Sequence, residues 1–288
     1  MPPSPTTQAV TSDRGAPRIE RTVVAGRPRR LLDWDEIRQY RDLLRFLTRR
    51  QILARYKQTL LGVLWAVIQP VLTMVVFSVV LGGMVGVPSE GIPYPVYAYL
   101  GILLWQLASS VVARTTMSVV GNAGLITQVY FPRIVLPASA TLSAVVDYAI
   151  AWVVLFVIMA VYGVAPHWTT LLLPLVVAAT AVVAMGIGMG FAALNVRYRD
   201  VGQVLPLLLQ LWMFATPVVY PAALVPERWR LLYAMNPMAG LVEAHRAAVL
   251  GHGPDLILLG ISLASGLVLA ALGGRLFLRM ERRFADIV

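Results

Sequence analysis

The sequence contains no cysteine and only three histidines among its 288 residues. The absence of cysteine excludes disulfide bonds, thiolate metal sites and a thiol nucleophile. The histidines, His167, His245 and His252, form no HExxH pattern, so we expect no metal site. Lysine occurs once, as Lys57, and no GxxxxGK[ST] loop is present. The chain is therefore not expected to hydrolyse ATP through a phosphate-binding loop.

Charged residues are also scarce, at 13% of the chain against 58% hydrophobic residues. This composition is too apolar for an ordinary soluble protein. A helix needs roughly 20 apolar residues to cross a bilayer, and six such stretches are present. The sequence therefore predicts an all-α integral membrane protein with six transmembrane helices. The expected spans are Leu60–Val85, Tyr97–Val120, Ile134–Tyr162, Thr169–Leu194, Val201–Val219 and Leu256–Leu278.

Positive charge is distributed unevenly around these spans. The net charge is +10, from 24 lysines and arginines against 14 acidic residues. Twenty of the cations lie on one side of the expected topology, in the N-terminal segment, the second and fourth loops and the C-terminal end. Three lie on the other side, in the fifth loop, and Arg114 lies within a span. Cytoplasmic loops are enriched in lysine and arginine, so we expect both termini to be cytoplasmic. The topology accounts for the charge, and a nucleic-acid partner is not expected.

Three regions are expected along the chain. Residues 1–30 contain five prolines and no apolar periodicity, which is typical of a disordered cytoplasmic tail. Residues 31–58 combine periodic apolar positions with arginines on other faces. They predict an amphipathic helix in the membrane interface, with a solvated helix as the alternative. Residues 59–288 are expected to form the six-span domain.

The long fifth loop, Tyr220–Asp255, contains two short amphipathic segments, Glu227–Met235 and Met238–Leu250. Both are too short to cross the membrane, and we expect a re-entrant outer hairpin buried against protein. Asn236 is the expected N-cap of the second segment, with Pro237 at its first helical position.

The spans carry few groups that could perform chemistry. A bilayer enzyme needs a nucleophile with a base, paired carboxylates or a metal, and none is evident. The two deep ionisable residues are Arg114 and Asp147. Because unpaired charge in hydrocarbon is costly, they could form an ion pair, line a conduit or couple to protons.

Two further patterns concern the spans. Small residues recur every four positions in the fourth and last spans, which favours close helix packing inside the bundle, or a dimer seam. They are Ala184, Gly188 and Ala192, then Ser262, Gly266, Ala270 and Gly274. Polar and aromatic residues near spans one and five could line a sugar conduit or face lipid. They are Trp65, Gln69, Gln210, Trp212, Phe214, Thr216 and Tyr220.

Three segments together resemble the permeases of type-2 ABC exporters for O-antigen, teichoic-acid and capsular polysaccharides. They are ARYKQTLLGVLWAVIQP (Ala54–Pro70), LNVRYRDVGQVLPLLLQLWMFATPVVYP (Leu194–Pro221) and NPMAGLVEAHRAAVLG (Asn236–Gly251). The resemblance implies six spans behind an interfacial helix, a homodimeric pore, outer re-entrant gate helices and a coupling helix near Asn122–Arg133.

The resemblance also implies cargo and partners. The family exports polysaccharides linked to polyprenyl pyrophosphate across the bacterial inner membrane. Two copies of a separate ATPase subunit would bind ATP and magnesium, and this chain would need no cofactor of its own. Membrane lipids are further expected partners. Rival interpretations are an ion-coupled secondary carrier, which needs several ionisable groups at the midplane, and a membrane glycosyltransferase, which needs clustered acids.

For a chain with such a cargo and partner, we expect three groups of site residues from their types and positions in the sequence. For coupling to the ATPase they are Gln128, Tyr130, Phe131 and Arg133, whose aromatics could instead anchor the loop. For the outer gate they are Trp229, Tyr233, Asn236, Pro237, Glu243 and Arg246. For the cargo pyrophosphate they are Arg49, Arg50, Arg55 and Lys57, although topology and anionic headgroups could explain the same four cations.

Overall fold

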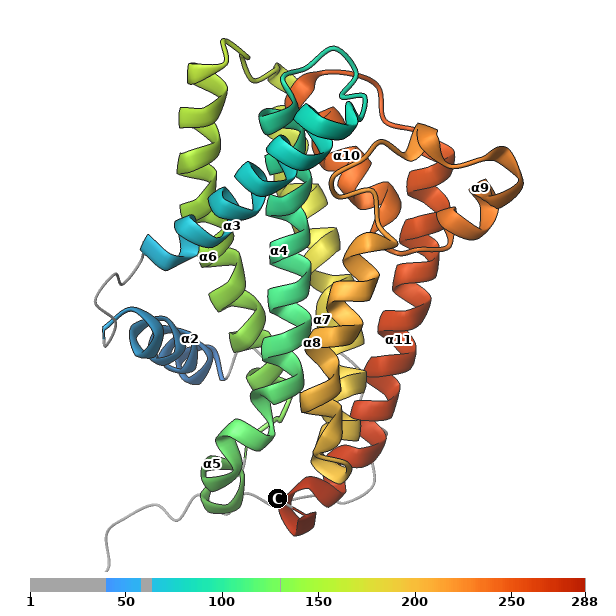
Figure 1. Cartoon of the computed structure of the whole chain (residues 1–288). Helices are drawn as coiled ribbons and strands as arrows, with labels where there is room; N and C mark the ends of the chain where they lie inside the picture. The colour runs from blue at the N-terminus through green and yellow to red at the C-terminus, as the bar shows by residue number, and fades with distance from the viewer. Residues whose placement is uncertain (1–39, 58–63, 130, 288) are drawn as a thin grey trace, which may run out of the picture. The chain divides into compact units, whose positions relative to one another are not determined.

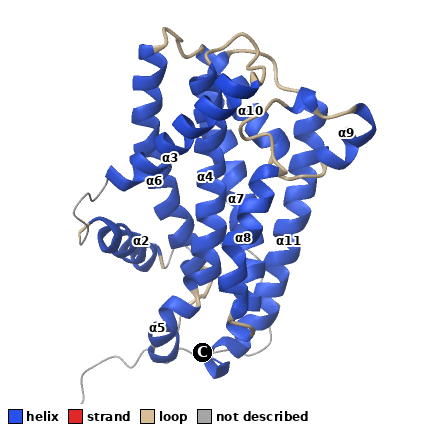
Figure 2. Ribbon diagram, in the orientation of Figure 1, coloured by secondary structure: helices blue, strands red, loops and turns tan. Residues whose placement is uncertain are grey.

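The computed structural model describes residues 40–57, 64–129 and 131–287. Every regular element in these ranges is helical, and Figure 2 shows no strand there. The expected all-α fold is confirmed for this part of the chain. The helices that form the bundle run alongside one another (Figure 1), and they are α4 (Tyr94–Ser118), α6 (Val135–Val161), α7 (Leu173–Arg197), α8 (Asp200–Phe214) and α11 (Leu256–Ile287).

Among the described residues, five helical stretches are long and apolar enough to cross a membrane. They are Leu64–Val85, Tyr94–Ser118, Val135–Val161, Trp168–Arg197 and Leu256–Glu281. The first combines α3 (Leu64–Phe77) with the π-helical η1 (Ser78–Val85), and the fourth begins with the 3-10 helix η3 (Trp168–Leu172). Five of the six expected spans therefore correspond to helices of spanning length.

The expected fifth span is shorter than predicted, because α8 ends at Phe214 rather than Val219. Its 15 residues extend about 22 Å, against about 30 Å for the hydrocarbon core. The chain turns after Phe214, where Pro217 disfavours helical backbone at Thr216. The Asn236 side-chain amide also donates to the carbonyl of Ala215 at 2.9 Å, which holds this turn in place.

Prolines mark the beginnings of several helices. Pro95, Pro137 and Pro174 lie in the first turns of α4, α6 and α7. A proline is tolerated there because the first N–H groups of a helix have no partner within it. At the other end of α6, Gly163 adopts a positive φ of 68°, which favours glycine and lets the chain reverse.

Helix α4 lies at the centre of the bundle and is largely buried, whereas α3 and α11 expose most of their length. Helix α4 packs against α6, α7, α3, α8 and α10 (Ala239–Leu250). The Tyr99 hydroxyl of α4 donates to the Ala151 carbonyl of α6 at 3.0 Å. The hydrophobic core therefore surrounds α4.

Small residues allow α7 to approach its neighbours closely. A Cβ on Gly186 would lie 2.4 Å from the Cβ of Ala270 in α11. A Cβ on Gly188 would lie 2.7 Å from the Cβ of Thr115 in α4, and one on Gly266 would lie 3.0 Å from Val183. Packing within the bundle, one of the two interpretations of the predicted small residues, is confirmed at Gly188, Gly266 and Ala270.

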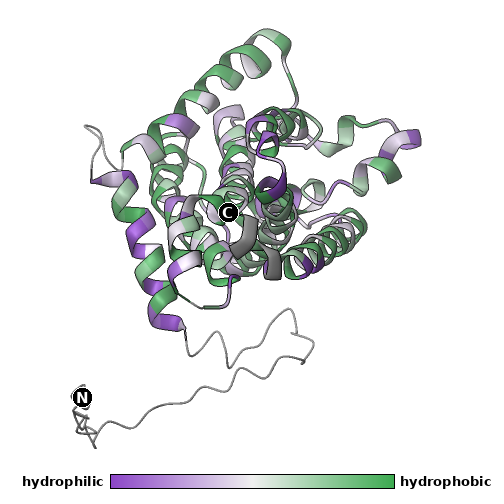
Figure 3. Ribbon diagram, turned by 90° about the horizontal axis from the view of Figure 1, so that it is seen from below, coloured by the Kyte–Doolittle hydropathy of each residue, from purple (hydrophilic) through white to green (hydrophobic). Residues whose placement is uncertain are grey.

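Helix α2 (Arg41–Tyr56) packs against α6, and Figure 3 shows polar and apolar residues interleaved along it. Leu47 is its buried residue, in a cluster with Phe131 and Phe277. The expected tail at 1–30 and the expected start of this helix, at 31–39, lie outside the described residues. A short helix, α5 (Ala123–Gln128), lies between α4 and α6 in the chain.

The expected loop segments form α9 (Glu227–Ala234) and α10. The predicted cap between them is wrong: α10 begins at Ala239, its N-cap is Met238, and no side chain caps it. Asn236 instead accepts from the Met238 N–H at 3.1 Å and from the Trp212 indole N–H at 2.9 Å. A turn at 236–239 therefore precedes the helix, because the Asn236 side chain is engaged by the end of α8.

Candidate functional site

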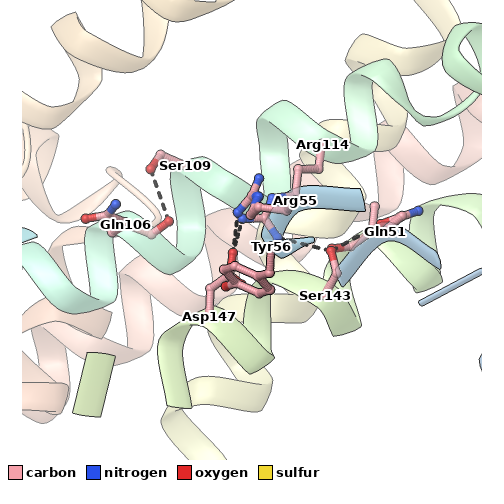
Figure 4. Close-up of polar contacts among 9 residues, drawn as sticks. Gln51, Arg55, Tyr56, Gln106, Ser109, Arg114, Ser143 and Asp147 are labelled. Carbon is pink, nitrogen blue, oxygen red and sulfur yellow. Dashed lines mark hydrogen bonds and ion pairs between the residues drawn. The ribbon is translucent and has the colours of Figure 1, made fainter. Parts of the chain in front are cut away.

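Asp147, midway along α6, accepts hydrogen bonds from side chains of two other helices (Figure 4). Its carboxylate accepts hydrogen bonds from the guanidinium groups of Arg55 in α2 and Arg114 in α4, and from the hydroxyl of Tyr56. These four residues are called the Asp147 cluster below. The arginine and the aspartate that lie deep in the expected spans thus form an ion pair, and α2 contributes a second cation.

A polar stripe on α6 continues from the cluster. Ser143 lies one turn before Asp147 and accepts from Arg114 Nη1 at 3.0 Å. Its hydroxyl donates to Gln51 Oε1 at 3.1 Å, and the Gln51 amide donates to Ser139 Oγ at 3.0 Å. The spacing of four between 139, 143 and 147 places these groups on one face of the helix. Side chains of α2 therefore bond to this face at three successive turns.

The cluster is partly open, and two guanidinium groups face one carboxylate. The side chains of Arg114 and Asp147 are 18% and 15% exposed, and that of Arg55 is 47% exposed. Burial and the hydrogen bond to Asp147 raise the pKa of Tyr56 to about 12, so its hydroxyl stays a donor at neutral pH.

A cavity of about 430 Å³, named the aromatic cavity here, lies on one side of the cluster. Its volume is within the range of roughly 300–1,000 Å³ found for small-molecule sites. Besides the four cluster residues, its aromatic and polar lining comprises Trp65, Gln69 and Thr73 from α3, Trp105, Gln106, Ser109 and Ser110 from α4, and Tyr148 from α6. Figure 4 shows Gln106 and Ser109 on the same helix as Arg114. The lining combines flat apolar faces with amides and hydroxyls.

A second cavity of about 310 Å³, named the polar cavity, shares Arg55, Arg114 and Asp147 with the first. Its other lining residues include Ser118 and Asn122, toward the α5 end of α4. Along α4, residues of the aromatic cavity precede Arg114 and those of the polar cavity follow it. The Asp147 cluster therefore lies at the boundary between two cavities.

The four cations predicted as one group are divided by the structure. Arg55 belongs to the Asp147 cluster, whereas Arg49, Arg50 and Lys57 line a third cavity of about 520 Å³ beside Phe46. Phe46 is exposed, so this cationic cavity combines positive charge with apolar surface. That combination is typical of a helix that binds anionic headgroups.

The predicted conduit residues also separate. Trp65 and Gln69 line the aromatic cavity. The other five do not line it. Trp212 packs edge-on against Trp105 with the ring centres 5.4 Å apart, and Thr216 is buried in the turn after α8. Gln210 and Phe214 are exposed, and the Tyr220 hydroxyl donates to the Phe214 carbonyl at 2.9 Å.

Sequence reasoning missed most of the α4 lining. Gln106, Ser110 and Arg114 follow one another at spacings of four, which places them on one helical face. A polar face in an otherwise apolar span is a signal that a conduit lies beside it. That spacing was available from the sequence and predicts the wall of the aromatic cavity.

Helix α10 carries a second arginine–acid pair. Arg246 has 0% exposure, and its Nη1 lies 3.3 Å from Glu243 Oε1. Its Nη2 donates to the Val218 carbonyl at 2.5 Å, and its guanidinium lies 3.9 Å from the centre of the Tyr97 ring. These residues, called the Arg246 cluster, join α10, the turn after α8 and the start of α4. Glu243 also accepts from the Ala222 N–H at 3.1 Å.

The remaining predicted gate residues surround this region without forming one site. Asn236 bonds to the end of α8, as described above, and Pro237 packs near Gly266 of α11. Tyr233 lines a cavity of about 220 Å³ with Glu243. Trp229 is 51% exposed on α9.

A buried contact that the sequence did not reveal connects α6 to α10. The Tyr148 hydroxyl and His245 Nε2 are 2.8 Å apart, and His245 has 0% exposure. Tyr148 directly follows Asp147 in the chain and lines the aromatic cavity. Consecutive residues of α6 therefore contact α2 and α10.

The predicted coupling residues differ in exposure. Phe131 is 1% exposed and packs in a cluster with Leu47 and Phe277, which favours the anchoring interpretation for this side chain. Gln128 is exposed at the end of α5, whereas the backbone N–H of Arg133 donates to Glu281 Oε1 at 3.3 Å. Tyr130 lies outside the described residues.

Comparisons with known proteins agree with this architecture. The sequence profile of the ABC-2 type transporter family matches residues 42–250. The chain therefore belongs to the ABC-2 type transporter family and is a multi-pass membrane permease.

Relatives with assigned names are similar over most of the chain. The O-antigen export system permease protein RfbA of Myxococcus xanthus is 31% identical over 257 residues, covering 88% of this chain and 98% of that protein. The Klebsiella pneumoniae protein of the same name is 27% identical, covering 86% and 95%. The polysialic acid transport protein KpsM of Escherichia coli is 26% identical, covering 74% and 82%.

Proposed function

We propose that the chain is the membrane subunit of an ATP-driven exporter, and that its cargo is a polysaccharide linked to polyprenyl pyrophosphate. The observation that carries this proposal is the aromatic cavity between α3, α4 and α6. Aromatic faces pack against the apolar faces of sugar rings, and amides and hydroxyls bond to sugar hydroxyls. The names of the relatives support a polysaccharide cargo.

We propose that two copies of the chain form the pore. Each copy contributes one aromatic cavity, flanked by exposed apolar residues of α3 and α8 such as Val76 and Leu207. A larger conduit would form where two such faces meet. Cross-linking between cysteines placed on α3 tests this arrangement, because the natural chain has no cysteine to interfere.

The energy source in this proposal is a pair of separate ATPase subunits that bind ATP and magnesium, with no cofactor on this chain. Helix α5 is the proposed contact, through the exposed Gln128 and the half-buried Arg133 nearby. The distribution of arginine supports a cytoplasmic position for α5 and for both termini, in the bacterial inner membrane. In this orientation α2 is the interfacial helix, α8 completes a set of six spans, and α9 with α10 form the re-entrant outer gate.

The test reconstitutes the chain with its ATPase in vesicles and supplies polyprenyl-pyrophosphate-linked glycan. We expect the glycan to stimulate ATP hydrolysis and to appear on the far side of the membrane. A complex whose ATPase carries an inactivated phosphate-binding lysine is the matched control. An ion-coupled carrier would instead transport without the ATPase and stop when a protonophore is added, which would contradict the proposal.

A further inference from the structure

We infer that Arg55 and Arg114 form a binding site for the diphosphate of the cargo, and that Asp147 competes with the diphosphate for these two guanidinium groups. This inference rests on the proposed transport of a polyprenyl pyrophosphate. It assigns the recognition of the anionic head group to the boundary between the aromatic and polar cavities.

Geometry provides the first argument. The guanidinium groups of Arg55 and Arg114 come from different helices, and both donate to the same oxygen, Oδ2, of Asp147. Two arginine forks that converge on one oxygen are positioned to bind an anion that offers several oxygens. A diphosphate offers more acceptors than one carboxylate, so it can satisfy both forks together.

Charge provides the second argument. Two cationic guanidinium groups share the single Asp147 carboxylate. A diphosphate carries more negative charge than a carboxylate and gains more from the same two cations. Asp147 opposes it twice, by occupying the arginines and by repelling the incoming anion. Removing the negative charge of Asp147 should therefore tighten binding.

Location provides the third argument. Arg55, Arg114 and Asp147 line both cavities, so an anion reaches them without breaking packed contacts. On the aromatic side lie Trp65 and Trp105, next to which the first sugar of the glycan can stack. The Arg246 cluster lacks this access, because its guanidinium is 0% exposed and already placed against a carbonyl and a tyrosine ring.

The experiment measures binding of farnesyl pyrophosphate to the purified full-length chain in nanodiscs of neutral lipid. Tryptophan fluorescence is a suitable signal, since Trp65 and Trp105 line the adjacent cavity. We expect Arg55→Gln and Arg114→Gln each to weaken binding about tenfold, because a charged fork is lost. Asp147→Asn, which keeps the shape of the side chain, should strengthen binding about fivefold.

Matched controls separate this site from the other cations of α2. Arg45→Gln makes the same chemical change on the same helix, at an exposed residue that pairs with Asp42, and should leave binding unchanged. Arg49→Gln removes a cation from the cationic cavity and should also leave it unchanged. An Arg49→Gln loss as large as that of Arg55→Gln would overturn the inference.

Further variants keep the test decisive if Asp147→Asn does not fold. Tyr56→Phe removes one hydrogen-bond donor to Asp147 and no charge. Asp147 should then be held less firmly, and farnesyl pyrophosphate should bind about twofold more tightly. Arg114→Lys keeps the charge but loses the fork, so it should weaken binding. Size-exclusion profiles establish that each variant is folded. Folded Asp147→Asn or Tyr56→Phe protein that binds no more tightly than the natural chain would overturn the competition.

Two other probes distinguish the source of the anion. Inorganic pyrophosphate should compete weakly, because it shares the diphosphate but lacks the lipid. Phosphatidylglycerol should not compete, and equal competition by this lipid would overturn a diphosphate site in favour of a general headgroup contact. A chain that exports glycan but binds no farnesyl pyrophosphate would overturn this site alone. A chain that binds at Arg55 and Arg114 without exporting would overturn the proposed function alone.

Discussion

The two ion clusters of this permease enclose their arginines differently. Arg246 is sealed at 0% exposure, between the Glu243 carboxylate, the Val218 carbonyl and the face of Tyr97. Arg114 is 18% exposed, lines two cavities and shares its carboxylate with the half-exposed Arg55. Each cluster joins segments that are distant in the sequence, yet only in the Asp147 cluster do the arginines themselves line cavities.

This difference indicates different roles. A sealed ion pair cannot exchange its partner without breaking the surrounding structure, so the Arg246 cluster fixes α10 against α4 and the turn after α8. An ion pair beside cavities can exchange a carboxylate for another anion at lower cost. Because exposure also screens charge, the Asp147 cluster should contribute less to stability than the Arg246 cluster.

The largest expected effect follows removal of the sealed arginine. Arg246→Ala leaves the Glu243 carboxylate buried without its cation, which should cost about 3–5 kcal/mol of stability. Arg114→Gln should cost clearly less, because Asp147 keeps Arg55 and Tyr56 as donors. Denaturation in detergent, followed by tryptophan fluorescence, measures both. Equal losses would remove the distinction between the clusters.

The next effect concerns the packing around Arg246. A Cβ added at Gly101 would lie 1.9 Å from the Val218 oxygen and 2.5 Å from Arg246 Nη2. Gly101→Ala should therefore destabilise the protein by about 1–3 kcal/mol. Gly124→Ala is the control, because nothing lies within 4 Å of its Cβ position. The control should be neutral or slightly stabilising, and a Gly101→Ala protein as stable as the control would contradict the sealed geometry.

A smaller effect tests the contact between α6 and α10. Tyr148→Phe removes the hydroxyl that lies 2.8 Å from His245 Nε2 and leaves the ring in place. The expected loss is about 1 kcal/mol, the usual net contribution of a hydrogen bond. Unfolding of Tyr148→Phe should be compared with that of Tyr162→Phe, whose side chain is 47% exposed. Equal stability of the two variants would show that the contact does not hold α10.

The smallest effect is expected at Arg55. Its side chain is 47% exposed, so its ion pair with Asp147 is screened by solvent. Arg55→Lys keeps the charge and should change stability by only about 0–1 kcal/mol. A thermal unfolding scan against the natural chain measures the difference. A loss as large as that of Arg246→Ala would show that the Asp147 cluster is a structural clamp.

The sequence predicted the ionisable part of the site better than its lining. Arg114 and Asp147 stand out because charge is rare in apolar spans, and an ion pair between them was one of three interpretations. The contribution of Arg55 depends on how α2 packs against α6, and no local pattern encodes that packing. The contact between Tyr148 and His245 was missed for the same reason. It joins two residues that lie 97 positions apart in the sequence.

The prediction of α8 shows a limit of hydropathy. The apolar run continues to Val219, yet the helix ends at Phe214. Asn236, which is 21 residues beyond Ala215, bonds to its carbonyl and stabilises a turn there. The apolar run that predicted a membrane span therefore includes this buried turn. Hydropathy does not separate the two, because apolar side chains are buried in protein as well as in lipid. Gln210 and Phe214, which were also predicted for the conduit, are exposed on α8 and lie outside the aromatic cavity.

The central claim is that the Asp147 cluster recognises the head group of the cargo during export. Its most direct test is the stimulation of ATP hydrolysis by polyprenyl-pyrophosphate-linked glycan, in vesicles that contain the chain and its ATPase. With Arg114→Gln, the glycan concentration that gives half-maximal stimulation should rise about tenfold, because one charged fork is lost. Stimulation by Arg114→Gln at the same glycan concentration as the natural chain would contradict the claim.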